Sequence, residues 1–201
     1  ILSLTGHGPY YDRVVKDGSY SASGMFTDVK VNWWELAGKT IGVIGLGNIG
    51  LRVAKVAEAF GMNVCYYSTS GTSHNKDYPS LPLEKLLAVS DIVSIHAPLN
   101  EKTRGLIGSR ELSIMKPSAY IVNMGRGGIV EEQALAAAVD NGVIAGAALD
   151  VFEVEPLPKD SCFLKVRHPE RFRLAPHVAW ASVEARERLV GMIADNIAKG
   201  W

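Results

Sequence analysis

Residues 41–50 read "IGVIGLGNIG", an apolar run interrupted by Gly45, Gly47 and Gly50. The run before the first glycine is typical of a buried strand, and a helical pattern begins near Asn48, so the glycines join a strand to a helix. In that setting the first glycine permits a tight turn, the second lets a pyrophosphate approach the backbone, and the third lets helix and strand pack closely. The positive end of the helix then faces the anion. This stretch therefore predicts a dinucleotide site.

The rest of the chain alternates between two patterns. Short β-branched runs predict strands at residues 40–45, 63–67, 91–96, 119–124, 144–150 and 171–175. Apolar residues at helical spacing predict helices at residues 51–60, 82–90, 109–115, 131–142 and 182–199. Repeated strand–helix alternation favours a parallel sheet, and the nearly continuous apolar strands indicate that both of its faces are covered. We therefore expect an α/β fold, a doubly wound parallel sheet with helices on both faces.

Composition narrows the classes of partner. Lys plus Arg and Asp plus Glu number 21 each among 201 residues, so no net charge favours nucleic acid or an anionic membrane. We find neither an apolar run long enough to cross a membrane nor a signal-peptide pattern, and we expect a cytoplasmic protein. Cys65 and Cys162 lie in no metal-binding pattern, so we expect two small core residues and no metal site.

The end of the second predicted strand bears on the choice of cofactor. An acidic residue is usual there, about 20 positions after the glycines, because it binds the adenosine ribose of NAD. Here the position is occupied by Ser68, with Thr69 and Ser70 following and Lys76 nearby. No carboxylate repels a 2′-phosphate, yet no arginine binds one. Either NAD or NADP remains possible, and the segment also fits an ordinary polar loop.

Four charged or titratable residues follow the later strands. Arg126 lies among glycines after the fourth strand, Asp150 and Glu155 follow the fifth, and His177 follows the sixth. Open α/β sheets bind ligands at these strand ends. Taken singly, Arg126 also fits a surface ion pair, Glu155 a solvated charge in a loop, and His177 a residue at the start of a helix. Together, a guanidinium that binds a carboxylate and a histidine paired with a glutamate suit acid catalysis on an organic acid.

At this point the sequence resembles a known family. The motifs "GVIGLGNIG", "SDIVSIHAPLNEKTRGLIG", "MKPSAYIVNMGRGGIVEEQAL", "GAALDVFEVEP" and "APHVAW" resemble the coenzyme-binding domain of the D-isomer-specific 2-hydroxyacid dehydrogenases over almost the whole chain. The resemblance implies a Rossmann-type fold and hydride transfer between NAD or NADP and C2 of a small 2-hydroxy or 2-oxo acid. Glycerate dehydrogenases, which reduce hydroxypyruvate or glyoxylate, look most similar. The family resembles, and includes, corepressors that use the same fold to sense NAD(H). A binding protein of that type is the alternative to an enzyme.

The resemblance also implies roles for residues. Arg126 would hold the substrate carboxylate, His177 would donate the proton, and Glu155 would orient His177 and raise its pKa. His96 is expected to be structural rather than a second acid. The cofactor would contact the three glycines and a further set: Asn48, Ile49, Ser68, Ala97, Pro98, Thr103, Met124, Gly125, Arg126, Asp150, His177 and Trp180.

The family pattern predicts the domain organisation. Residues 1–38, with an amphipathic helix over 1–15, would form an interdomain helix and a dimer arm, and residues 39–201 the dinucleotide-binding domain. The aromatic residues of the arm, Tyr10, Tyr11, Trp33 and Trp34, suit a homodimer interface, although local packing against the sheet is the alternative. The substrate domain would be largely missing from this chain, which alone would then be weakly active or inactive.

Overall fold

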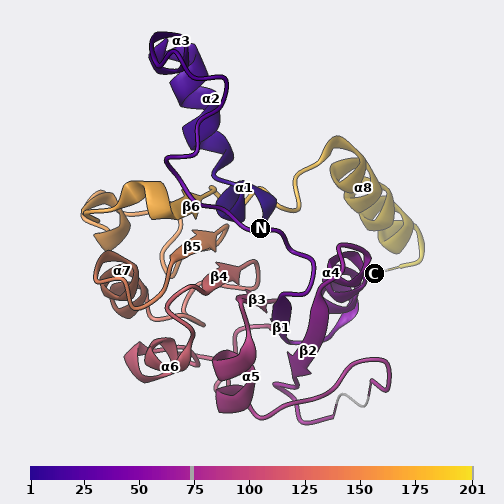
Figure 1. Ribbon diagram of the computed structural model, residues 1–201. Helices are drawn as coiled ribbons and strands as arrows, with labels where there is room; N and C mark the ends of the chain where they lie inside the picture. Colours follow the sequence, from indigo (N-terminus) through magenta and orange to yellow (C-terminus); the bar gives the residue numbers. More distant parts are fainter. Residues whose placement is uncertain (73–74, 201) are drawn as a thin grey trace.

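The computed structural model describes residues 1–72 and 75–200, and within them a six-stranded parallel sheet has the order β2-β1-β3-β4-β5-β6 (Figure 1). Each strand falls inside a range predicted from the sequence. The strands are β1 (Thr40–Ile44), β2 (Asn63–Tyr67), β3 (Ile92–Ile95), β4 (Tyr120–Asn123), β5 (Gly146–Leu149) and β6 (Phe172–Leu174). The expected doubly wound, Rossmann-type sheet is confirmed.

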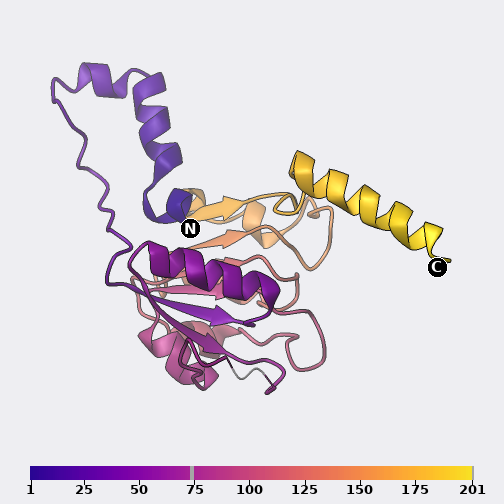
Figure 2. The same ribbon diagram turned by 90° about the vertical axis from the view of Figure 1, so that its right-hand side faces the viewer.

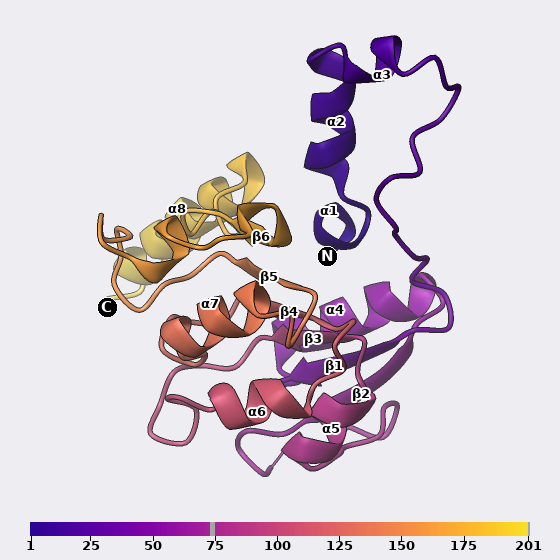
Figure 3. The same ribbon diagram turned by 60° about the vertical axis from the view of Figure 1, so that its left-hand side comes forward.

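Helices cover both faces of this sheet (Figure 3). On one face α5 (Leu83–Val89), α6 (Ser109–Ile114) and α7 (Glu132–Asp140) share a buried cluster with Ile44, Val93 and Ile95. On the other, α4 (Asn48–Ala59) and α1 (Leu2–Thr5) share a second cluster with Ile41, Val43 and Ile92. Neighbouring strand residues point to opposite faces. Both faces of the sheet are therefore shielded from solvent, which explains why the strands are apolar along their whole length.

The order of the strands positions the site. The chain passes from β1 to β2 on one side and then returns to β3 on the other side of β1. Beyond β2, Ser80 forms an isolated parallel bridge with Tyr66, so one more short segment borders the sheet. Ligands of open α/β sheets bind where the order reverses, at the carboxyl ends of the strands. Here that place is the crevice between the ends of β1 and β3.

The N-terminal segment differs from the single helix expected over residues 1–15. It breaks at Gly6–His7, where His7 adopts a left-handed conformation with φ of 50°. The short α1 buries Leu4 near β5 and β6, whereas α2 (Gly8–Lys16) and α3 (Ser19–Ala22) project away from the sheet and bury no residue (Figure 2). A left-handed residue cannot continue an α-helix, so the chain turns there.

The C-terminal helix α8 (Val183–Ala198) also extends from the sheet and has no buried residue (Figure 2). Among the described residues, no helix combines the length and the apolar character needed to cross a membrane. Cys65 is buried as expected, but Cys162 is only partly buried, because it begins the short 3-10 helix η1 (Cys162–Leu164) in the connection between β5 and β6.

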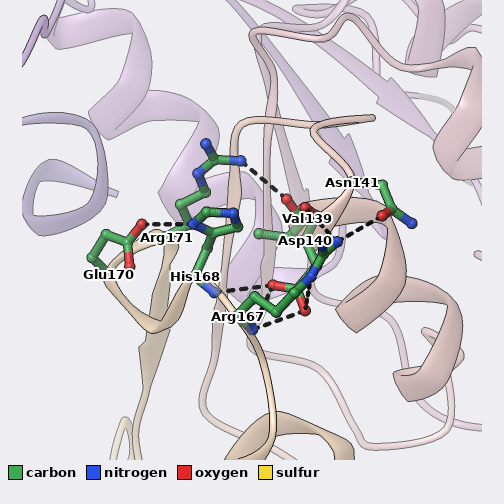
Figure 4. A network of polar contacts seen from close by, with 7 residues as sticks. All are labelled: Val139, Asp140, Asn141, Arg167, His168, Glu170 and Arg171. Carbon is green, nitrogen blue, oxygen red and sulfur yellow. Dashed lines mark hydrogen bonds and ion pairs between the residues drawn. The ribbon is translucent and has the colours of Figure 1, made fainter.

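That long connection is anchored at the C-terminus of α7 (Figure 4). The Asp140 carboxylate accepts hydrogen bonds from the backbone N–H groups of Arg167 and His168, at 3.0 and 3.1 Å. The guanidinium groups of Arg167 and Arg171 donate to the carbonyl oxygens of Asp140 and Val139, at the end of the helix. The backbone donors lower the pKa of Asp140. Free helix carbonyls attract cations, so these contacts hold the connection in place ahead of β6.

Candidate active site

The glycine turn has the geometry expected of a dinucleotide site. Gly45 adopts φ of 89°, a left-handed conformation that glycine reaches without strain. A Cβ atom at Gly50 would overlap the carbonyl oxygen of Gly45, so only glycine lets α4 begin this close to β1. A Cβ at Gly47 would meet no atom within 4 Å, which leaves the backbone open to a ligand. The N–H groups of the first turn of α4, at Asn48, have no partner within the helix and suit a pyrophosphate.

A cleft of about 650 Å³ opens beside this turn. One wall is the loop after β2, and the other is the loop after β3. Its lining is Gly45, Leu46, Gly47, Ser68, Thr69, Ser70, Thr72, His96, Pro98, Asn100, Glu101 and Lys102. The structure thus places the glycine turn, Ser68 and Pro98 of the expected cofactor set around one cleft. Lys76 borders an adjacent groove that also includes Ser68 and Gly71, so a contact between Lys76 and a 2′-phosphate stays a prediction.

Two other expected cofactor residues do not line this cleft. Ile49 borders an apolar groove on α4 together with Ile1 and Val53. Thr103 is fully buried, and its hydroxyl donates to the carbonyl oxygen of Pro98 at 2.7 Å. Thr103 therefore shapes the loop after β3 and cannot touch a ligand in the cleft with its side chain.

Arg126 extends from a turn held by a buried side chain that the sequence did not single out. The Asn123 amide, 2% exposed, accepts a hydrogen bond from Gly125 N–H at 3.0 Å and donates to the Arg126 carbonyl at 2.9 Å. Both functional ends of the amide thus fix the chain around Met124 and Gly125. Ala97 is buried against the same turn, where a Cβ at Gly125 would come within 2.7 Å of its carbonyl oxygen. The Arg126 guanidinium itself is exposed to solvent at the sheet edge.

Glu155 and His177 form a direct pair. Glu155 Oε2 lies 2.7 Å from Nδ1 of His177, while Oε1 accepts a hydrogen bond from Phe152 N–H at 2.8 Å. The hydrogen bond from His177 is the largest cause of the lowered pKa of Glu155, followed by Phe152 N–H, and the charge of Arg126 contributes. Glu155 is therefore a carboxylate at neutral pH. With Nδ1 held in this way, Nε2 of His177 is the ring atom left to exchange a proton.

The backbone of His177 is held from a second side. His177 adopts φ of 55°, which is unusual for a residue other than glycine and is typical of functional sites. Asp150 is 3% exposed, and its two carboxylate oxygens accept hydrogen bonds from the N–H groups of Val178 and Ala179, both at 2.9 Å. Asp150, expected to contact the cofactor, is thus also a positioning residue for the loop that carries His177. Trp180, at the end of this loop, is 51% exposed.

His96, which lines the cleft, is not suited to donate a proton near neutral pH. Burial lowers the pKa of His96 to about 4, and its Nε2 lies 2.9 Å from the Ser94 hydroxyl. The ring is therefore neutral near pH 7 and has no extra proton to donate. The structural role predicted for His96 agrees with this geometry.

Replacing Glu155 with glutamine removes an anion from Nδ1 of His177 while retaining an acceptor for Phe152 N–H. Because Glu155 has a lowered pKa, it is an anion over the whole neutral range, and it orients the His177 ring through Nδ1. Glutamine can still face the ring but supplies no charge, so in the reduction that the sequence resemblance implies we expect kcat to fall by about tenfold. Steady-state rates of reduction measure this change. An unchanged kcat would contradict the role of the carboxylate.

The fold and this edge of the sheet define a class of protein: a dinucleotide-binding α/β domain with an arginine and a glutamate-paired histidine beside the cofactor cleft. The family model described as "D-isomer specific 2-hydroxyacid dehydrogenase, NAD binding domain" matches residues 1–179. The chain belongs to this family. The resemblance noted in the sequence is thereby confirmed, as is a nicotinamide dinucleotide as the cofactor of the family.

Individual relatives agree with this assignment. The chain is 41% identical over 192 residues to a glyoxylate reductase from Korarchaeum cryptofilum, covering 92% of this chain and 55% of that protein. It is 38% identical over 187 residues to a glycerate dehydrogenase from Methylorubrum extorquens, covering 93% and 58%. The solved structure of an NADPH-dependent glyoxylate/hydroxypyruvate reductase from Sinorhizobium meliloti matches with a TM-score of 0.83 and 31% identity, over 98% of this chain and 60% of that chain. The chain therefore spans somewhat more than half the length of these relatives.

Proposed function

We propose that the protein is an oxidoreductase that transfers a hydride between NAD or NADP and C2 of a small D-2-hydroxy or 2-oxo acid, with glyoxylate or hydroxypyruvate as the oxo acid. The observation that carries the proposal is the pair of Glu155 and His177, 2.7 Å apart, at the same sheet edge as Arg126 and the glycine turn. The names of the relatives, glyoxylate reductase and glycerate dehydrogenase, support this substrate class.

Each residue has a distinct task in this proposal. When bound, the dihydronicotinamide ring supplies the hydride. The Arg126 guanidinium binds the substrate carboxylate with two parallel N–H donors and so orients the adjacent carbonyl. His177 gives the proton on Nε2 to the carbonyl oxygen as the alcohol forms, while Glu155 holds Nδ1. Asn123 fixes the turn that carries Arg126, and Asp150 fixes the loop that carries His177, each through hydrogen bonds to backbone groups.

The direct test is turnover. Glyoxylate and hydroxypyruvate are offered with NADH or NADPH to a polypeptide that includes any residues encoded on either side of these 201, and oxidation of the reduced cofactor is followed by its loss of absorbance. We expect consumption of cofactor with at least one of the two acids. Tight cofactor binding without turnover of any small 2-oxo acid would contradict the proposal and favour the alternative of a cofactor-sensing binding protein.

We also propose the domain roles: residues 1–38 as an interdomain helix and dimer arm, and residues 39–201 as the dinucleotide-binding domain. The arm exposes large apolar side chains, including Phe26 at 90% and Val29 at 74%. Apolar and aromatic residues that stand away from their own domain are typical of a subunit interface. Trp34, by contrast, packs against Tyr120 with ring centroids 5.9 Å apart, which fits the local-packing alternative for that residue.

The proposed dimer interface can be tested at Phe26, which is 90% exposed on the arm. Replacing Phe26 with aspartate places a charge in the proposed interface, and we expect dimer dissociation to become easier by at least about tenfold. Sedimentation equilibrium over a range of concentrations measures this change. Val183→Asp on α8 is the control, because Val183 is 57% exposed and lies outside the arm. A wild-type protein that is monomeric at all concentrations would exclude the arm as a dimer contact.

A further inference from the structure

The cleft beside the glycine turn has two walls of different chemistry. The wall after β2 presents Ser68, Thr69, Ser70 and Thr72, and none of these is charged. The wall after β3 presents Asn100, Glu101 and Lys102. In a Rossmann-type site the carboxylate that excludes a 2′-phosphate comes from the end of β2, and that carboxylate is missing here. The choice between NADH and NADPH therefore depends on what the other wall supplies.

The hydroxyl wall is already folded into a turn. Gly71 adopts φ of 74°, and its N–H donates to the Ser68 carbonyl at 3.3 Å. The Ser70 hydroxyl accepts a hydrogen bond from Thr72 N–H at 3.2 Å and lies 2.8 Å from the Thr72 hydroxyl. Because two paired hydroxyls share one hydrogen between them, the other hydrogen is left to donate outward. A prefolded turn with outward hydroxyl donors suits the oxygens of a phosphate.

The facing wall supplies the positive charge. Lys102 is exposed at the cleft, and within the described part of the chain its ammonium group forms no ion pair; only its backbone N–H is engaged, with the Asn100 side chain at 2.9 Å. The neighbouring Glu101 also borders the cleft, so the wall carries one charge of each sign. A compact ammonium on a long flexible stem can reach across a cleft to a phosphate, whereas the shorter glutamate stays closer to its own loop.

We infer that the cleft prefers NADPH and that Lys102, from the wall opposite the β2 loop, is the cation that contacts the 2′-phosphate while the Ser68–Thr72 turn donates hydroxyl hydrogen bonds. The inference rests on the proposed function and names the cofactor for it. It differs from the usual arrangement, in which the end of β2 itself supplies the discriminating charge.

The test is calorimetric titration of the 201-residue chain with NADPH and with NADH at one salt concentration. We expect NADPH to bind at least about fivefold more tightly, as one exposed charge-assisted contact would provide. In Lys102→Met the affinity for NADPH should fall by about fivefold and that for NADH should stay within about twofold. Lys85→Met on α5 is the control, since it removes the same charge from an exposed position outside the cleft.

The outcomes separate this inference from the proposed function. If neither cofactor binds, the proposed function fails together with the inference. If both bind but NADH is preferred or equal, only the inference is overturned. If Lys102→Met weakens both cofactors alike, or if Lys76→Met rather than Lys102→Met selectively weakens NADPH, the assignment of Lys102 is overturned.

Discussion

Replacing His177 with asparagine should lower the rate of reduction by about 10²- to 10⁴-fold, because the variant has no group that can deliver a proton to the substrate oxygen. Asparagine is the appropriate replacement, since the residue must adopt φ of 55° and asparagine tolerates the left-handed conformation. The contacts of Asp150 with Val178 and Ala179 involve backbone groups and remain available. Steady-state kinetics, together with titration of the cofactor, measure the two effects separately.

The expected signature is a fall in kcat with cofactor affinity unchanged to within about twofold. His168→Asn is the matched control, because His168 also lies beside a glutamate, with Nδ1 3.2 Å from Glu170, but belongs to the anchored connection at the end of α7. Full activity of His177→Asn would remove His177 from the reaction. An equal loss in His168→Asn would indicate that the effect arises from general damage to the fold.

Replacing Gly127 with alanine should destabilise the protein by about 1–3 kcal/mol or more, because there is no room for a methyl group. A Cβ at this position would overlap the carbonyl group of Phe152 and come within 2.4 Å of the Glu153 backbone nitrogen. That segment cannot move aside easily. The Phe152 ring is buried and packs against Phe163 with centroids 6.0 Å apart, and the Phe152 N–H is bonded to Glu155.

The effect extends to activity, since the displaced segment carries the acceptor that holds His177. We expect a lower midpoint of urea unfolding and a lower kcat in Gly127→Ala. Gly191→Ala is the control: it lies in α8, an added Cβ meets nothing within 4 Å, and alanine favours a helix. Its midpoint should be unchanged or slightly higher. An unchanged midpoint in Gly127→Ala would contradict this prediction, because it would mean that the backbone at Phe152 shifts to make room for the methyl group.

Much of the fold could be predicted from residues that are close together in the sequence. The strands were predictable because parallel strands covered on both faces are apolar along their whole length, and the turn at Gly45 was predictable because a strand, three glycines and a helix follow one another directly in the chain. The single N-terminal helix expected was wrong, because Gly6, Gly8 and Pro9 flank the left-handed His7 and outweigh the helical spacing of the apolar residues. The direction of a side chain was not predictable either: Thr103, expected among the cofactor residues, is buried with its hydroxyl bonded to the Pro98 carbonyl oxygen.

The sequence by itself determined the class of fold, the glycine turn and the family, because each depends on residues that are neighbours along the chain or on motifs in a set order. Only the tertiary structure decided which groups meet. Glu155 and His177 are separated by 22 positions, and Asp150 and Val178 by 28, and they come together because β5 and β6 pair in parallel and end at the same edge. The position of Lys102 across the cleft from Ser68 likewise follows from the strand order, which places the ends of β2 and β3 on either side of β1.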